Sequence, residues 1–274
     1  MDFNNQTSCK NCDEPLTTPF CGHCGQPKAV RITFKELMRT IQMGLLEFRS
    51  PFLHTFKMLT IAPGKVCRDY VEGKRERYFN PIKYALWVVT VTVFISAFTN
   101  NSLSDFQAFG EISSTKSEDD KQFSATLRNL IDSSQFFIVF FYAAVFALVL
   151  RIFFRKQDFN IFELYILAIL PSAHITWVTA ILVGLGWYNT PSGIAVTTLI
   201  GFVFCIYAYT TFFDGKWLPN LVRSLVSYIL AMLLFVFSFG LSIGIAAGVK
   251  HAQDQEVSIE QQEVVDAFEE TKAN

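Results

Sequence analysis

FELYILAILPSAHITWVTAILVGLG, residues 162–186, is the stretch that decides the fold class. About 20 mostly apolar residues are enough for a helix to cross a bilayer, and this stretch holds only two ionisable residues, Glu163 near one end and His174 inside. The chain is 51% hydrophobic and 17% charged, whereas soluble domains carry about 25% charged residues. Working outward from this stretch, we expect an all-α membrane protein with five transmembrane helices, at residues 82–98, 136–154, 162–186, 194–213 and 221–249.

The 23 lysines and arginines are unevenly distributed between alternate loops. Thirteen lie in residues 1–83, and the loops after the second and fourth spans add three and two. The external loop 99–135 has three, the tail 250–274 has two and the third loop has none. Since basic loops stay on the cytoplasmic side, we expect a cytoplasmic N-terminus and an external, acidic tail at 250–274. We expect no cleavable signal peptide, because residues 1–30 hold no apolar segment. The net charge of −1 gives no reason to expect a nucleic-acid partner.

Two CxxC pairs, Cys9 with Cys12 and Cys21 with Cys24, lie eight residues apart. Cysteines at this spacing are typical of a tetrahedral zinc site, and four thiolates close its coordination shell. We therefore expect a structural zinc ion in a zinc-ribbon-like head at residues 1–30, whose folding depends on the metal. Two disulfides are the main alternative, but disulfides are rare in the cytoplasm. A redox pair would need a βαβ context, and His23 could replace one cysteine ligand.

Residues 31–80 read as an amphipathic and basic juxtamembrane segment. Apolar residues recur at three- and four-residue steps over 34–48 and 52–59, which predicts two helices, and Pro63-Gly64 ends the second. These helices either lie in the lipid surface or pack under the bundle. Beyond them, a basic stretch either contacts anionic lipid or only fixes the topology. Its candidate lipid-contacting residues are Lys65, Arg68, Lys74, Arg75 and Arg77.

Two features inside the predicted spans carry further hypotheses. His174 follows Pro171 by three residues, and an ionisable residue at membrane depth is a functional candidate. It is either part of a ligand or proton site, or a neutral histidine hydrogen-bonded between packed helices. In the last span, Gly240, Gly244 and Gly248 share one face. Such a face permits close helix packing, within the bundle or in a homodimer.

The order of these features resembles a bacterial membrane family known only as domain of unknown function 3667. The resemblance covers about residues 9–83. It rests on the double CxxC ending in Cys24-Gly25-Gln26, then on Thr33-Phe34, Thr55, Pro63-Gly64, Tyr70, Gly73-Lys74-Arg75, Tyr78 and Asn80-Pro81. It implies a zinc-ribbon-like head on a small helical membrane domain in a bacterial inner membrane. It supplies no catalytic residues.

The sequence favours a non-enzymatic protein of the lipid bilayer, with a cytoplasmic head that docks a protein partner. The closed metal site and the lack of a catalytic constellation motivate this interpretation. The alternative is a transporter or channel for a small or lipid-like solute, with Pro171 and His174 at a broken helix. An enzyme acting on lipids would need acidic residues converging on His174, which the sequence does not offer.

Overall fold

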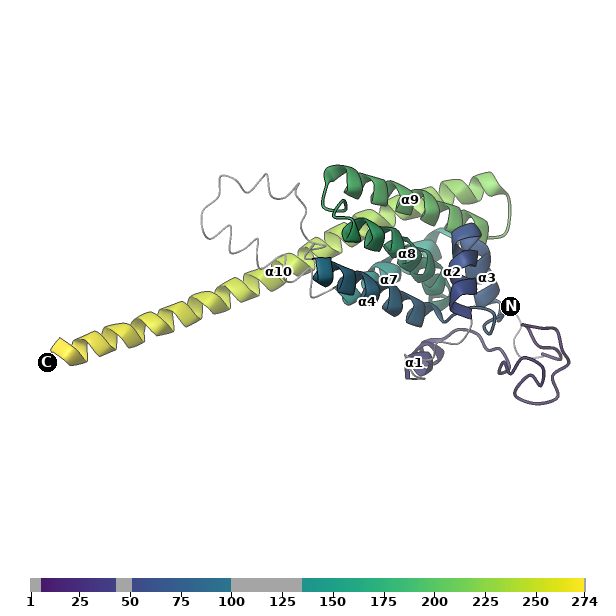
Figure 1. Cartoon of the computed structure of the whole chain (residues 1–274), viewed down its shortest axis with the longest axis horizontal. Helices are drawn as coiled ribbons and strands as arrows, with labels where there is room; N and C mark the ends of the chain where they lie inside the picture. The colour runs from purple at the N-terminus through teal and green to yellow at the C-terminus, as the bar shows by residue number, and fades with distance from the viewer. Residues whose placement is uncertain (1–5, 43–50, 100–134, 274) are drawn as a thin grey trace.

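The long apolar stretch at residues 162–186 forms helix α8, Ile161–Gly184. The computed structural model describes residues 6–42, 51–99 and 135–273, and every regular element in these ranges is a helix (Figure 1). Pro171 lies inside α8. The N-terminus of α8 is fixed by a capping box, in which the Asn160 side chain accepts from the Glu163 N–H and the Glu163 carboxylate accepts from the Asn160 N–H.

Five helices in the described ranges are long and apolar enough to cross a membrane. Besides α8 these are α4 (Pro81–Thr99), α7 (Gln135–Phe153), α9 (Pro191–Phe212) and the apolar part of α10, Trp217–Ser242. Each predicted span overlaps one of them, so the predicted all-α membrane fold is confirmed. The predicted external loop 99–135 lies, apart from its two ends, outside the described residues.

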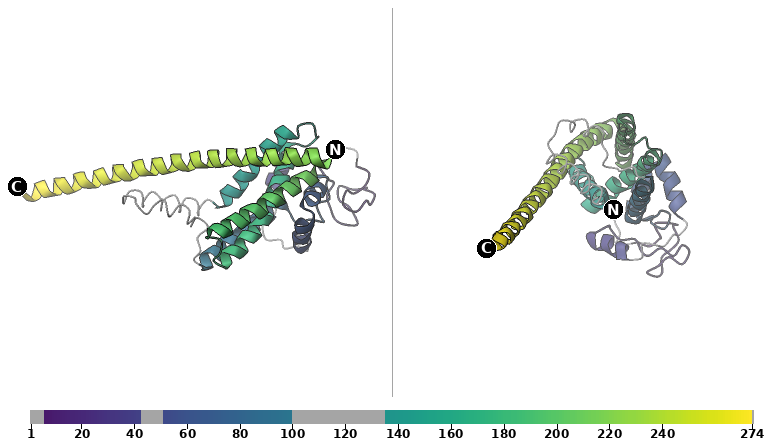
Figure 2. Two further views of the ribbon diagram at one scale, coloured as in Figure 1. Left: turned by 90° about the horizontal axis from the view of Figure 1, so that it is seen from above. Right: turned by 60° about the vertical axis from the view of Figure 1, so that its left-hand side comes forward.

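α10 runs from Trp217 to Ala273 as one helix of 57 residues. It packs against α7 and α9 near its start. Its C-terminal half lies apart from the other helices in all three views (Figures 1 and 2). The tail that was expected after residue 249 therefore continues the helix of the last span.

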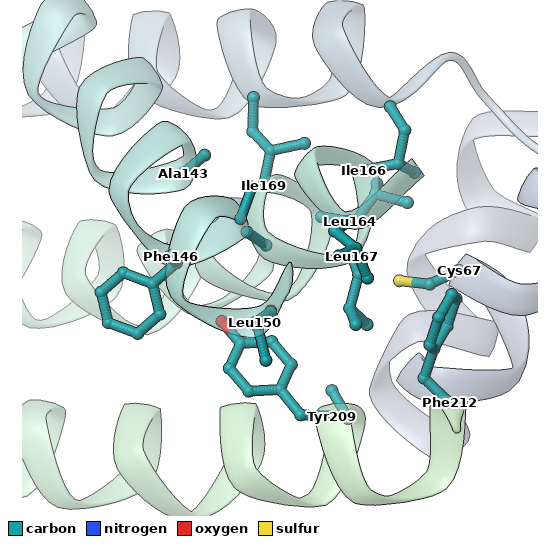
Figure 3. Close-up of a cluster of buried hydrophobic side chains, with 14 of the residues drawn as sticks. Cys67, Ala143, Phe146, Leu150, Leu164, Ile166, Leu167, Ile169, Tyr209 and Phe212 are labelled. Carbon is teal, nitrogen blue, oxygen red and sulfur yellow. The ribbon is translucent and has the colours of Figure 1, made fainter. Parts of the chain in front are cut away.

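α8 is the central helix of the bundle. In the apolar 18-residue segment of α8, 61% of the residues are buried, against 33% or less in the corresponding segments of the other four spans. Figure 3 shows side chains of α8 between those of α7, α9 and α3, including Leu167 of α8, Phe146 of α7 and Phe212 of α9. The core thus forms around α8, the most buried of the five spans.

Three short helices precede the spans. They are α1 (Phe34–Gln42), α2 (Pro51–Ile61) and α3 (Pro63–Val71). α1 and α2 match the two predicted amphipathic helices, although residues 43–48 of the first lie outside the described residues. α3 was not predicted: Pro63 ends α2 and also begins α3, because proline suits the first helical position.

Candidate metal centre

The two cysteine pairs fold into matching turns. The Cys9 N–H donates to the carbonyl of Glu14, and the Cys21 N–H donates to the carbonyl of Gln26, each at 2.8 Å. An isolated β-bridge closes each turn, Ser8 with Pro15 and Phe20 with Pro27. The head, residues 6–28, is therefore a repeat of one cysteine turn.

The fourth residue after the first cysteine of each turn has a positive φ. This angle is 62° at Asp13 and 74° at Gly25. Glycine adopts this conformation freely, and aspartate is among the few other residues that tolerate it. This equivalence was not predicted, although Asp13 and Gly25, each directly after the second cysteine of a CxxC pair, are its signal in the sequence.

The two turns bring four thiols together. All four Sγ atoms, of Cys9, Cys12, Cys21 and Cys24, lie within 4.8 Å of one another. The shortest separations are 3.5 Å between Cys12 and Cys21 and 3.6 Å between Cys9 and Cys24. Tetrahedral coordination with metal–sulfur bonds of about 2.3 Å separates sulfurs by about 3.8 Å. The cluster therefore fits one metal ion.

Gln26 joins the head to the docking platform, which we define as residues 63–80. Its side-chain Nε2 donates to the Gly73 carbonyl at 2.8 Å. Its Oε1 accepts from the N–H groups of Arg75 at 3.0 Å and Glu76 at 3.1 Å. Gln26 is only 3% exposed, so these hydrogen bonds are shielded from water and strongly favour the docked position.

Gly73 allows this close approach. Its φ is 108°, a conformation that other residues rarely adopt. A Cβ at Gly73 would lie 2.9 Å from the Cβ of Ala29 and 3.3 Å from that of Lys10. Gly73 thus has a conformational and a steric reason to be glycine.

The strap, residues 29–33, connects the head to the start of α8. Arg31 Nε donates to Glu163 Oε1 at 3.0 Å, and its Nη2 donates to the Asp158 carbonyl at 3.1 Å. Asn160 Nδ2 donates to the Ile32 carbonyl at 2.8 Å. The hydrogen bond with the fully buried Glu163 raises the pKa of the Arg31 guanidinium. Glu163 was expected only to lie near a span end, but its carboxylate anchors the strap.

The platform is held together around the buried carboxylate of Asp69. Lys74 Nζ donates to Asp69 Oδ1 at 2.7 Å, and the Tyr78 hydroxyl donates to Oδ2 at 2.9 Å. Burial alone would raise the pKa of Asp69, but the two hydrogen bonds outweigh it and hold the pKa below its usual value. Burial and the bond to Asp69 raise the pKa of Tyr78.

Four of the five candidate lipid-contacting residues have protein partners. Lys65 and Lys74 pair with Asp69, and Arg68 pairs with Glu72 and with Asp214. Arg75 donates to the Val30 carbonyl and lies 3.9 Å from Glu36. Arg77 is exposed. Contact of these five residues with anionic lipid stays a prediction, and the geometry adds a structural role for four of them.

His174 lies at the junction of α2, α4 and α8, and it is 7% exposed. Its Nδ1 is 2.7 Å from the Tyr84 hydroxyl, and its Nε2 is 3.0 Å from Thr60 Oγ1. Trp177 Nε1 donates to the Tyr84 hydroxyl, and Thr60 Oγ1 donates to the Phe56 carbonyl. These four hydrogen bonds form a continuous series. Each N–H or O–H hydrogen in the series has one acceptor if His174 is neutral with its proton on Nε2. The geometry matches a histidine hydrogen-bonded between packed helices. Pro171 lies one turn earlier.

The glycine face of α10 has no neighbour among the described residues. A Cβ at Gly240, Gly244 or Gly248 would meet no described atom within 4 Å. Packing of this face against another part of the described bundle is therefore not seen. The homodimer alternative stays a prediction.

The comparisons with known proteins match one part of the chain. The family described as "Protein of unknown function (DUF3667)" matches residues 49–94. This confirms the resemblance over α2, α3, the platform and most of α4, and the four cysteines lie outside the matched segment. No curated protein and no solved structure matches the chain.

Proposed function

We propose that this chain, which carries a domain of unknown function at residues 49–94, is a non-enzymatic membrane protein that presents a zinc-stabilised head to a protein partner. The closed donor set supports a structural metal, because four thiolates leave no coordination position for a substrate. Thiolate ligands at tetrahedral spacing favour zinc over harder cations. The charge distribution supports a cytoplasmic head, and the family resemblance motivates placing it on a bacterial inner membrane.

The observation that carries this proposal is the set of three hydrogen bonds that the Gln26 side chain makes with the platform. Gln26 is the last residue of the second cysteine turn, where its backbone carbonyl accepts from the Cys21 N–H. One residue therefore links the turn that carries the metal ligands to the platform. A head mounted in this way has a defined position relative to the membrane, which suits the docking of a partner.

The head has an exposed surface that suits such a partner. Residues 17–20 between the two cysteine pairs are exposed, and Phe20 is 59% exposed. Phe34, just after the strap, is 60% exposed. Aromatic side chains are enriched in the cores of protein interfaces. We place the partner-binding surface around Phe20.

The transport alternative rests on Pro171 and His174. Both ring nitrogens of His174 have hydrogen-bonding partners within the protein. This arrangement supports a packing role for His174 and so favours the interaction protein over the transporter.

Two measurements on the full chain test the proposal. Metal analysis of the purified protein should find one zinc per chain, and iron or no metal would contradict the zinc assignment. In native membranes, a photo-crosslinking residue at Phe20 should yield a discrete protein adduct. The matched control places the same residue at the exposed Lys57 on α2, where no such adduct is expected. An adduct at position 20 that persists in Cys21→Ser, after loss of metal has been verified, would contradict the role of the folded head.

A further inference from the structure

A groove of about 290 Å³ lies between the connections α7–α8 and α9–α10. Three cationic side chains line it: Arg155 and Lys156 from the first connection and Arg223 from the first turns of α10. All three are exposed, and none has an acidic partner in the part of the chain that the structure describes. The groove is therefore a concave site with unneutralised positive charge.

The acidic residue of the groove is already engaged. Asp214 lines the groove, and its carboxylate accepts from Arg68 Nη2 at 2.6 Å. Burial of Arg68 opposes its charge, yet the hydrogen bonds to Glu72 and Asp214 raise its pKa. Asp214 is one carboxylate and is already shared with Arg68, so the three cations leave the groove with a net positive charge.

The walls of the groove are fixed before any ligand binds. Gln157 Nε2 donates to the Asp214 carbonyl at 2.9 Å and so joins the two connections. Asn220 Nδ2 donates to the Phe213 carbonyl at 2.9 Å. The rings of Phe154 and Phe213 stack at 3.6 Å between centroids. A preformed site loses less conformational entropy on binding.

The groove lies at the border of the apolar spans. The span of α7 ends at Phe153, and that of α10 begins at Trp217. Trp217 is 61% exposed, as tryptophan at a membrane–water interface often is. Apolar side chains next to the groove residues in sequence are also exposed, among them Ile152 and Val222. The groove thus combines positive charge with a place at the edge of the apolar spans.

We infer that this groove binds the phosphate group of an anionic phospholipid. The platform cations that were expected to contact lipid are largely paired within the protein. Arg155, Lys156 and Arg223 carry charge that is available to a ligand. Arginine and lysine both bind phosphate oxygens through charge-assisted hydrogen bonds. Exposed apolar residues adjoin the lining residues in sequence, and the groove lies where the apolar spans end, as the acyl chains of a lipid require.

The experiment titrates full-length protein in detergent with short-chain phosphatidylglycerol and, separately, phosphatidylcholine, and it counts bound lipid by native mass spectrometry. We expect tighter binding of phosphatidylglycerol. The triple variant Arg155→Gln/Lys156→Gln/Arg223→Gln should lose this preference, with a loss of roughly fivefold per charge removed. The single variants Lys156→Gln and Arg223→Gln should show partial losses, which guards against misfolding of the triple variant.

The matched control removes three exposed cations elsewhere, as Lys28→Gln/Lys35→Gln/Lys57→Gln. It should keep the preference for phosphatidylglycerol. An equal loss in the control, or no loss in the groove variants, overturns the inference. A third arm adds inorganic phosphate: displacement of phosphatidylglycerol by equimolar phosphate would show that the groove binds free phosphate, and it would overturn the lipid assignment.

Discussion

Gln26 performs two tasks at the scale of a single residue. Its backbone carbonyl closes the second cysteine turn, and its side chain holds the platform turn at Gly73, Arg75 and Glu76. Any change that unfolds the cysteine turn also displaces the side-chain amide. The metal cluster is thereby coupled to the platform through the side chain of Gln26, in addition to the contacts of the strap with the start of α8.

Replacing Gly73 tests the close approach of head and platform. Gly73→Ala should destabilise the docked head by about 1–3 kcal/mol, because alanine is strained at a positive φ and its Cβ would meet Ala29. Limited proteolysis of residues 6–33 measures the docking. The matched control is Gly22→Ala in the head, where a Cβ meets nothing within 4 Å and φ is not positive. The resistance of this variant to proteolysis should equal that of wild type. Equal behaviour of the two variants would contradict the steric account.

Asp69 gives the platform a defined pH dependence. Because its hydrogen bonds hold its pKa below the usual value, its contribution to stability is complete above about pH 4 and is lost as the pH falls through the lowered pKa. Asp69→Asn should therefore be less stable than wild type by about 1–3 kcal/mol at pH 7. The difference should shrink below about pH 4.

Thermal unfolding of the two proteins in detergent, between neutral and acid pH, measures this difference. Glu76→Gln, which changes an exposed carboxyl in the same turn, should follow wild type at every pH. A difference between Asp69→Asn and wild type that grows on acidification would contradict the assignment.

At the scale of elements, a chain of hydrogen bonds attaches α2 to the membrane bundle. It runs from Trp177 through Tyr84 and His174 to Thr60 and the Phe56 carbonyl. A second link joins α2 to the platform, where the Phe79 N–H donates to the buried Thr55 Oγ1 at 2.7 Å. α2 therefore packs on the bundle, with Leu59 in the core and Phe52 and Met58 against it; packing under the bundle was one of the two alternatives left open by the sequence.

Two substitutions of similar size should differ in their effect on this attachment. Tyr84→Phe leaves Trp177 Nε1 without its acceptor and His174 Nδ1 without its donor, so we expect a loss of about 2–4 kcal/mol from two unsatisfied buried groups. Thr60→Val removes one acceptor at a partly exposed site, and the loss should be smaller. Hydrogen exchange of the α2 amides measures both. Faster exchange of the α2 amides in Thr60→Val than in Tyr84→Phe would contradict the proposed series of hydrogen bonds.

Some elements could be predicted from their own residues and others could not. The five spans follow from length and apolar content, and the cysteine turns follow from CxxC spacing. α3 escaped prediction because its charged residues suggested an interfacial segment, whereas its buried face includes Cys67 and Asp69. Burial of Asp69 depends on Lys74 and Tyr78, which lie outside the helix. Such pairing is tertiary and leaves no periodic signal.

At the scale of the whole molecule, three basic segments meet at one end of the bundle: residues 1–83, the α7–α8 connection and the α9–α10 connection. Arg31 of the strap contacts the α7–α8 connection at Asp158, and Arg68 of the platform contacts the α9–α10 connection at Asp214. The positive-inside count assigned these segments to one side of the membrane, and the contacts agree with that assignment. Which side it is stays a prediction.

Protease-site insertion tests this arrangement in membranes. A cleavage site inserted at 214–216 should be cut only from the face that carries the head, and a site at 186–190 only from the opposite face. Sealed vesicles of known orientation provide the measurement, and both sites should be cut once detergent opens the vesicles. Cleavage of both sites from one face would contradict the five-span topology.

The candidate site shows the same division between local and long-range information. The four cysteines were found from spacing alone. The docking of the head was missed, because Gln26 and Gly73 are far apart in sequence and neither residue type signals a contact by itself. Glu163 was likewise read as a span-end residue, since its partner Arg31 lies in another segment.

The central claim is that metal binding in the head and order in the platform are coupled through Gln26. Hydrogen–deuterium exchange at the amides of Arg75 and Glu76, before and after removal of the metal by a chelator, tests it most directly. Both amides donate to Gln26 Oε1. We predict that they exchange about tenfold faster or more after metal removal, while the amides of α8 keep their protection. Unchanged protection of Arg75 and Glu76 in the metal-free protein would contradict the claim.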